Sequence, residues 1–400
     1  MKLLFYRYGS ICEPDIILGF QELGHTVLEI TAEMSGPALT PQESIQIFSN
    51  QLLAQPVDFV FSINFFPFVS EVCNIFKLPY LCWTVDSPVM ELFTGSVSHP
   101  WNRIFLFDRA QYQEISPLNP GRVFHLPLAV NIVQKQNIIQ KTSAKMHPEF
   151  SSDVSFVGSL YTEKCPYDKL SEPPDYLCGY LEGLMEAQIR IYGGFLIEEL
   201  LPEQIIQDFK QHLPGFFTNP FATHLTDRQT VAQLYIGNKI SSMERLRALE
   251  ALSTRFSVDL YTASDASCLA QIHNRGLANT LEEMPLIFHN SKINLNITSK
   301  SIRSGIPLRI FDILGCGGFA LTNFQLELPE LFLVGEDLVC YENMEDLICK
   351  TDYFLRHESE RLEIAEKGFE TVKKYHTYPL RLEKMLHLAF SRNDASIPAE

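Results

Sequence analysis

Residues 289–322 constrain the fold more than any other part of the chain, because they read as a strand, a loop, a helix and a second strand. Apolar and polar residues alternate from Ile293 to Ile297, as in a short strand. The loop 298–305 contains hydroxyl groups, two cations and a glycine, and Pro307 suits the first turn of a helix. Glycines then separate this helix from the apolar strand 319–321. A strand that feeds a helix through such a loop predicts an α/β domain with an anion site.

The anion site is expected at the N-terminus of that helix, where unpaired N–H groups carry a partial positive charge. Lys300 and Arg303 can add full charges, so a diphosphate would fit there. Arg309 and Asp312 share one face of the helix, and the carboxylate could accept hydrogen bonds from a ribose diol. The alternative is an ordinary surface Arg–Asp pair, which is a common and weak interaction.

The first part of the chain repeats a strand–helix–strand pattern and predicts one doubly wound domain over residues 1–145. Ligands of open α/β sheets bind beyond the carboxyl ends of the strands, so the residues that follow each strand are candidates. The candidate ligand contacts chosen on this basis are Gly9, Ser10, Asn64, Trp83 and Asp86. The alternative for any one of them is that Pro and Asp merely end strands and begin helices. No G-x-G-x-x-G follows the first strand, which argues against a dehydrogenase-type dinucleotide site.

Composition limits the classes of partner. The chain has 400 residues, 46% of them hydrophobic, which is enough for two domains. Its formal net charge of −16 argues against a nucleic-acid or anionic-membrane partner. The nine cysteines show no metal-ligand spacing, so we expect them to be reduced thiols of a cytoplasmic protein. No apolar run approaches the roughly 18 residues of a spanning helix, so no membrane span is expected. The N-terminal residues do not resemble a signal peptide.

Several segments resemble a known family. In the C-terminal half they are SKINLNIT, GIPLRIFDILGCGGF, ELF, GEDLVCY and KKYHTYPLR, and in the N-terminal half FSINFFP, CWTVDSP, FLFDR and HLPLAVN. Together they resemble CgeB-type (spore-maturation-like) glycosyltransferases, relatives of the group 1 glycosyltransferases. The resemblance implies an α/β fold of two facing Rossmann-like domains (GT-B type). It implies that the C-terminal domain holds a nucleotide-diphosphate sugar and that the N-terminal domain, with the candidates named above, shapes the acceptor side. The active site would then lie in the cleft between the domains.

The resemblance also suggests roles for individual residues. Group 1 enzymes carry two glutamates eight positions apart, the first near the sugar and the second on the ribose, where this chain has Ser304 and Asp312. Asp312 therefore takes the ribose role, and the sugar contact has no matching glutamate. Lys164 stands where a lysine often neutralises the diphosphate, although a solvated surface lysine is the alternative. The full set of predicted donor-binding residues is Lys164, Lys292, Asn296, Lys300, Arg303, Ser304, Gly305, Arg309 and Asp312.

The predicted second domain spans 146–375 and contains a helical insertion at about 166–240, where the βα rhythm is interrupted. A polar connector, 134–152, leads to the first predicted strand of this domain. The segment 376–390 is expected to pack back on the first domain, as in similar two-domain transferases.

The predicted function is a glycosyltransferase without a bound cofactor, whose donor substrate is a nucleotide-diphosphate sugar and whose acceptor is unidentified. No metal site is expected, because the chain has no Asp-x-Asp motif and no His or Cys cluster. The predicted catalytic residue is Asp86, which partial burial would make a better base. Two other roles for Asp86 stay open, a helix cap and a hydroxyl ligand. The alternatives for the whole protein are a nucleotide-sugar epimerase or hydrolase, and a catalytically silent nucleotide-sugar-binding or surface-assembly protein.

Overall fold

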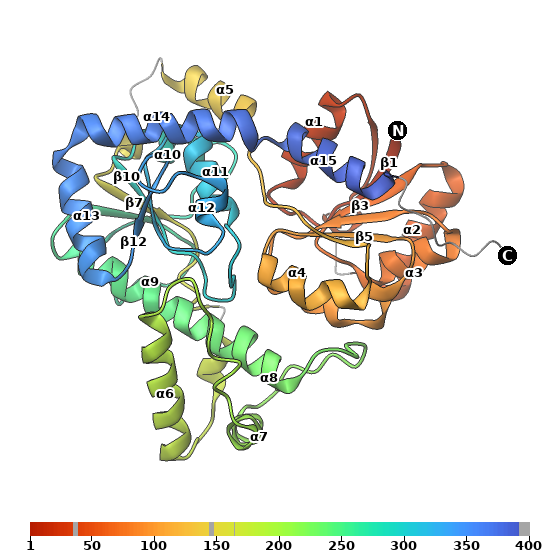
Figure 1. Ribbon diagram of the computed structural model, residues 1–400, viewed down its shortest axis with the longest axis horizontal. Helices are drawn as coiled ribbons and strands as arrows, with labels where there is room; N and C mark the ends of the chain where they lie inside the picture. The colour runs from red at the N-terminus through yellow and green to blue at the C-terminus, as the bar shows by residue number, and fades with distance from the viewer. Residues whose placement is uncertain (35–38, 144–147, 164, 392–400) are drawn as a thin grey trace. The chain divides into compact units, whose positions relative to one another are not determined.

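The computed structural model describes residues 1–34, 39–143, 148–163 and 165–391 and contains two α/β units (Figure 1). The first unit comprises Met1–Ala129 and the chain from Thr377 onward, and the second comprises Val130–His376. Each unit has a six-stranded sheet flanked by helices. The predicted fold class, two Rossmann-like domains with a helical insertion in the C-terminal half, is confirmed.

The sheet of the first unit is parallel throughout, with the strand order β2-β1-β3-β4-β5-β6. The strands are β1 Lys2–Tyr6, β2 Thr26–Ile30, β3 Phe59–Ile63, β4 Tyr80–Trp83, β5 Asn102–Leu106 and β6 Val123–His125. The helices are α1 Glu13–Glu22, α2 Pro41–Ala54, α3 Pro67–Phe76, α4 Arg109–Ile115 and α15 Tyr378–Phe390, with 3₁₀ turns η1 Ala32–Met34, η2 Met90–Phe93, η3 Gly95–Ser98 and η4 Ser116–Leu118. All residues of the central strands β3, β4 and β5 are buried, as expected where helices cover both faces of a parallel sheet.

The C-terminal helix α15 completes the first unit by packing on α1. The two helices approach closely at Gly19, where an added Cβ would lie 2.8 Å from Leu382 Cδ1. At the end of α15, the Arg103 guanidinium donates a hydrogen bond from Nε to the Ala389 carbonyl at 3.0 Å. The last helix is therefore part of the core of the first unit.

The sheet of the second unit is also parallel, with the order β12-β11-β10-β7-β8-β9. Its strands are β7 Val154–Val157, β8 Val258–Tyr261, β9 His273–Gly276, β10 Ile293–Asn296, β11 Ala320–Asn323 and β12 Val339–Tyr341. Its framework helices are α5 Ile132–Ser143, α9 Gly237–Ser253, α10 Met284–Asn290, α11 Leu308–Gly315, α12 Leu328–Leu331, α13 Met344–Arg356 and α14 Glu358–Tyr375, with a 3₁₀ turn η5 Pro148–Phe150. The edge strand β9 and the helix α10 were not predicted.

The helical insertion has a hydrophobic core of its own. It consists of η6 Pro166–Lys169, α6 Asp175–Ile189, α7 Glu203–His212, α8 Asp227–Gln229 and the π-helix η7 Thr230–Ile236, which continues into α9. Its core contains Leu181, Ile206, Phe209 and Tyr235. The insertion is therefore a folded module rather than an extended loop.

The boundary between the units differs from the predicted one at 145. The segment predicted as a polar connector contains α5, which packs against α10 and α11 and so belongs to the second unit. Within the described residues, no helix has both the length and the hydrophobicity needed to cross a lipid bilayer.

Each sheet has one point at which the strand order reverses, and this point positions the candidate sites. In the first unit the reversal lies between β1 and β3, and in the second between β7 and β10. The loops at the carboxyl ends of such neighbouring strands diverge and leave a crevice in which α/β proteins bind ligands.

Candidate functional site

In the first unit, the reversal point brings Tyr8, Asn64 and Asp86 together. The Asn64 amide donates from Nδ2 to Asp86 Oδ2 at 2.7 Å and to the Tyr8 hydroxyl at 3.0 Å. Its Oδ1 accepts the Val85 N–H at 3.1 Å. Asn64 has a φ of 57°, a left-handed conformation that asparagine tolerates better than most residues. The predicted candidates Asn64 and Asp86 are thus in contact, and Tyr8 joins them.

The predicted candidates Gly9 and Ser10 lie in the loop that follows β1. The Glu13 carboxylate is fully buried and accepts the N–H groups of Tyr8 and Gly9 at 2.9 and 3.0 Å. Gly9 has a φ of 94°, which favours glycine, and Ser10 accepts the Glu13 N–H through its carbonyl. Burial raises the pKa of Tyr8 to about 12, so its hydroxyl is protonated at neutral pH. The loop is therefore held in one conformation beside Asn64.

Two expectations for this region need correction. Trp83 is 0% exposed, donates from Nε1 to the Leu126 carbonyl at 3.1 Å and packs edge-on against Tyr378, so it is a core residue and not an acceptor contact. Asp86 is exposed rather than partly buried. The next helical turn, η2, has Val89 at its N-cap, so Asp86 is not a helix cap. A hydroxyl ligand and a general base remain as roles for Asp86.

In the second unit, Arg245 of α9 joins the two loops at the reversal point. Its Nη1 donates to the Ser159 carbonyl in the loop after β7 at 2.6 Å, and its Nη2 donates to the Ile297 carbonyl after β10 at 2.7 Å. The guanidinium also lies 4.6 Å from the centre of the Tyr161 ring. Sequence analysis missed Arg245, which fixes both loops at the edge where a ligand of this sheet is expected.

Lys300 lies in the loop after β10, but its charge is directed into the protein. Its Nζ lies 3.5 Å from Glu244 Oε1 and 4.1 Å from the centre of the Tyr192 ring, and the side chain is 7% exposed. Burial raises the pKa of Glu244 and lowers the pKa of Lys300, while each partner opposes the shift of the other. The expectation that Lys300 neutralises a ligand is corrected: it compensates a buried carboxylate.

Two other predicted donor residues have structural partners elsewhere. Asn296 is 5% exposed and donates to the hydroxyls of Thr298 and Thr322, so it joins β10 to β11. Lys292 precedes β10, at the amino edge of the sheet, and forms a half-exposed ion pair with Asp153 at 2.7 Å. Both are corrected to structural positions. Lys164 lies outside the described residues.

The predicted pair Arg309 and Asp312 is also directed at neighbouring helices. The Asp312 carboxylate is 2.9 Å from Lys135 Nζ of α5, and both side chains are less than 10% exposed. Arg309 contacts Met284 Sδ and lies 5.4 Å from the centre of the Phe288 ring, both in α10. In this structure Asp312 does not present an accessible carboxylate to a ribose, because α5 covers it.

Ser304, Gly305 and Arg303 remain at the carboxyl edge. The Ser304 hydroxyl donates to Glu327 Oε1 at 2.8 Å, and its carbonyl accepts the Glu327 N–H at 3.2 Å. Both side chains are buried, as is Gly305. Ser304, which stands where group 1 enzymes have their first glutamate, is thus bound to a glutamate from another part of the chain. The sequence did not indicate this contact with Glu327.

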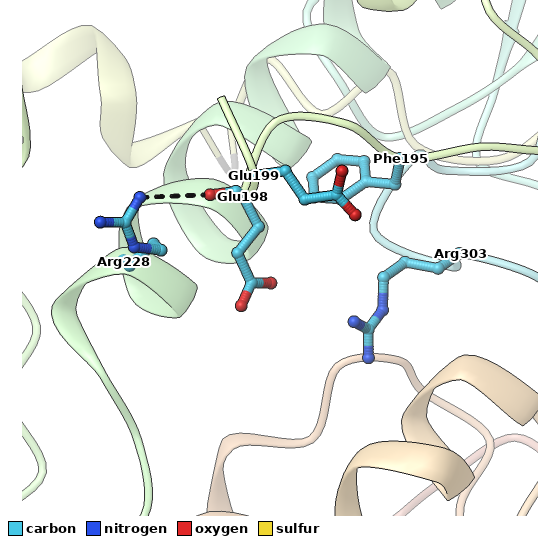
Figure 2. Close-up of a pocket in the computed structure, with 5 residues that line it drawn as sticks. All are labelled: Phe195, Glu198, Glu199, Arg228 and Arg303. Atoms are coloured by element: carbon cyan, nitrogen blue, oxygen red, sulfur yellow. Dashed lines mark hydrogen bonds between the residues drawn. The ribbon is translucent and has the colours of Figure 1, made fainter. Parts of the chain in front are cut away.

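Arg303 lines a cavity of about 600 Å³ together with residues of the insertion (Figure 2). The other lining residues are Phe195, Glu198, Glu199 and Arg228. Figure 2 shows the Glu198 carboxylate and the Arg303 guanidinium extending into the open space from opposite sides. The sequence did not point to these insertion residues, because the candidates were chosen from strand–helix patterns and 166–240 has none. The adjacent glutamates Glu198 and Glu199 were the one sequence feature that could have indicated a site there.

Comparison with protein families gives a match that lies mainly in the second unit. Residues 244–387 match the family described as glycosyl transferase-like. The match begins at Glu244 and includes the loop after β10 and all of α11. No curated protein gives a sequence match to the chain.

Three solved structures resemble the whole chain. Anabaena HepE in complex with UDP-glucose is 10% identical with a TM-score of 0.56 and covers 97% of this chain and 98% of its own. The sucrose-phosphate synthase of Thermosynechococcus elongatus is 9% identical with a TM-score of 0.53 and the same coverage. A glycosyltransferase from Rickettsia africae is 12% identical with a TM-score of 0.52 and covers 97% of both chains. With its two parallel six-stranded units and this likeness over nearly its full length, the chain has the GT-B fold of glycosyltransferases.

Proposed function

We propose that the protein is a glycosyltransferase that takes its sugar from a nucleotide-diphosphate donor. The observation that carries the proposal is that the glycosyl transferase-like match contains the loop after β10, which the structure places at the reversal point of its sheet. Ligands of such sheets bind at this point. The UDP-glucose bound to the Anabaena protein of similar fold supports a nucleotide sugar as the ligand.

The donor diphosphate is assigned to Arg303 and the N-terminus of α11. The loop is held in place by Arg245 and by the buried Lys300–Glu244 pair, so its backbone is pre-organised. Charge on a leaving diphosphate would be stabilised by the guanidinium and by the helix N–H groups. Loss of the diphosphate from the sugar carbon would thereby be favoured.

The acceptor side is assigned to Asp86 and Asn64 of the first unit. Asp86 is exposed and its orientation is fixed by the Asn64 amide at 2.7 Å. A carboxylate so oriented can take a proton from an acceptor hydroxyl as that hydroxyl attacks the sugar. The acceptor is not specified by these residues.

Three finer statements belong to the proposal. The family is proposed to be the CgeB type within the relatives of group 1 glycosyltransferases, on the segments quoted above. Turnover is proposed to need no divalent metal, because Arg303 and the helix N-terminus supply the positive charge at the diphosphate. EDTA should therefore leave the rate unchanged. A rate that EDTA abolishes and that manganese or magnesium restores would refute metal independence. The location is proposed to be the cytosol.

The test is a thermal-shift screen over nucleotide sugars followed by calorimetric titration. A ligand at 100 times its dissociation constant raises the free energy of unfolding by roughly 2.7 kcal/mol, which a melting curve detects. Arg303→Ala should weaken the affinity about ten- to hundredfold, the scale of a charge-assisted hydrogen bond. Lys292→Ala is the matched control, since its ammonium lies at the opposite edge of the sheet.

Failure of every nucleotide sugar to bind would refute the proposal. Binding without a glycosylated product, tested with a panel of acceptors, would favour the silent binding protein. A free or altered sugar in the absence of an acceptor would favour a hydrolase or an epimerase.

A further inference from the structure

The cavity of about 600 Å³ is built mainly by the insertion rather than by the βα framework. Phe195, Glu198, Glu199 and Arg228 come from the insertion, and Arg303 comes from the loop after β10 (Figure 2). A cavity of this size is within the range that holds small molecules in proteins. Since Arg303 belongs to both the loop and the cavity, a ligand with its phosphate at the loop would direct its next group into the cavity.

The walls of the cavity are held by buried contacts. Gln233, which is 1% exposed in the π-helix η7, donates from Nε2 to Glu198 Oε2 at 3.2 Å. The Arg228 guanidinium donates to the carbonyls of Leu201 and Glu198, the latter at 3.4 Å. Phe195 packs against the core of the insertion. Short π-helical segments are rare and occur often at functional sites. These groups are therefore oriented before any ligand arrives.

The side chains fit a neutral, hydroxyl-rich ligand better than an ion. Two glutamates and two arginines give the lining a formal charge that sums to zero, so neither an isolated anion nor an isolated cation is favoured. Carboxylates accept hydrogen bonds from hydroxyl groups and guanidinium groups donate them. The ring of Phe195 adds an apolar surface against which the C–H face of a sugar can pack.

We propose that this cavity is the subsite for the sugar of the donor, and that Glu198 and Glu199 bind its hydroxyl groups. The proposal rests on the proposed function and adds the part of the chain that selects the sugar. Ser304 does not supply a carboxylate at the sugar position, and its hydroxyl is bound to Glu327. The insertion supplies the carboxylates instead.

The test compares a nucleotide sugar with the nucleoside diphosphate that lacks the sugar, beginning with UDP-glucose and UDP and using the best-binding pair from the screen. Glu198→Gln and Glu199→Gln are titrated with both ligands by calorimetry. Glu182→Gln, an exposed glutamate of α6 that does not line the cavity, is the matched control. We expect the Glu198 variant to bind the nucleotide sugar about ten- to hundredfold more weakly, the Glu199 variant to be weakened less, and both to bind the nucleoside diphosphate as wild type does.

The other possible results contradict the sugar subsite, the proposed function or both. Equal loss for both ligands, or no loss for either in both variants, overturns the sugar subsite and leaves the proposed function intact. A change in acceptor KM with unchanged donor affinity places the acceptor in the cavity and also overturns the subsite. No binding of any nucleotide by the wild type overturns both. Glu199 is exposed, so its variant remains informative if Glu198→Gln lowers the melting temperature.

Discussion

The two units use the same kind of sheet edge in different ways. At the reversal point of the first unit, the Asp86 carboxylate is exposed and is oriented by one neutral amide. At the reversal point of the second unit, Lys300 is buried against Glu244, and nearby Asp312 is buried against Lys135. The Asp86 charge in the first unit is thus available to a ligand, whereas the Lys300 and Asp312 charges in the second unit are paired inside the protein.

The difference shows why residue type alone does not identify a ligand contact. Lys300 and Arg303 are three residues apart in the same loop, and both are cations. Lys300 meets α9 and pairs with a buried carboxylate, while Arg303 lines a cavity. Whether a cation of this loop meets a buried carboxylate or lines a cavity therefore depends on what the loop packs against.

The largest expected effect concerns the buried pair. Lys300→Met should lower the free energy of unfolding by about 3–5 kcal/mol, because it leaves the Glu244 carboxylate buried without its ammonium partner. Glu244→Gln should lower the free energy of unfolding by a similar amount, because it leaves the Lys300 ammonium buried without its carboxylate partner. The double variant should cost much less than the sum, and denaturant titration of all three measures the coupling. Additive losses would show that the pair does not maintain the loop as a unit.

The same pair predicts a pH dependence. Burial raises the pKa of Glu244 above its unfolded value of about 4.3. The folded state then binds more protons than the unfolded state above that pH, so this group's contribution to stability is present at low pH and is lost as pH rises through the folded pKa. Lys300→Met removes the charge that opposes the shift. The difference in free energy of unfolding between this variant and wild type should therefore widen from pH 5 to pH 8, and a constant difference would contradict it.

The next effect concerns the first unit. Asp86→Asn should lower turnover about a hundredfold, the usual scale of general-base catalysis, with unchanged nucleotide affinity and melting temperature. The substitution keeps the shape of the side chain and an oxygen that can accept from Asn64. The measurements are initial rates and calorimetry. Near-normal turnover would leave Asp86 with hydroxyl binding as its role.

A smaller effect is expected at Ser304. Ser304→Ala removes the hydroxyl that donates to the buried Glu327 carboxylate, and should lower the free energy of unfolding by about 1–3 kcal/mol. Ser253→Ala removes a solvent-exposed hydrogen bond to the Glu250 carbonyl at the end of α9, and should change the free energy of unfolding by less than about 0.5 kcal/mol. Equal melting temperatures for the two variants would mean that the Ser304–Glu327 contact does not hold the loop.

The smallest effect is expected at Lys292. Its pair with Asp153 has 50% and 39% of the two side chains exposed, so Lys292→Ala should cost about 0–1 kcal/mol in stability. Its affinity for the nucleotide sugar should equal that of wild type, in contrast to Arg303→Ala. A loss of affinity would return Lys292 to the donor site.

The sequence was sufficient for the fold class because continuous apolar strands and amphipathic helices are local patterns. It did not predict β9, whose residues, His273–Gly276, are polar or glycine and at most partly buried at the edge of the sheet. The loop before α11 led to the choice of Arg303, and the strand-end rule selected Asn64 and Asp86. It also selected Trp83, which still lies within the buried strand β4, because the rule does not fix the residue at which a strand ends. Partners such as Glu244, Glu327 and Lys135 lie far along the chain, and a sequence alone does not show which distant carboxylate meets which cation.

The placement of α15 has a consequence for how the protein is made. The core of the first unit includes Tyr378, which packs on Trp83, and Leu382, which meets Gly19. During synthesis these residues leave the ribosome after the whole second unit has been made. The second unit is continuous in sequence and can fold as the chain emerges, whereas the first must hold its apolar strands without their last helix until translation reaches it. A nascent chain stalled before Thr377 should therefore recruit chaperones through its N-terminal half, although that half is made first.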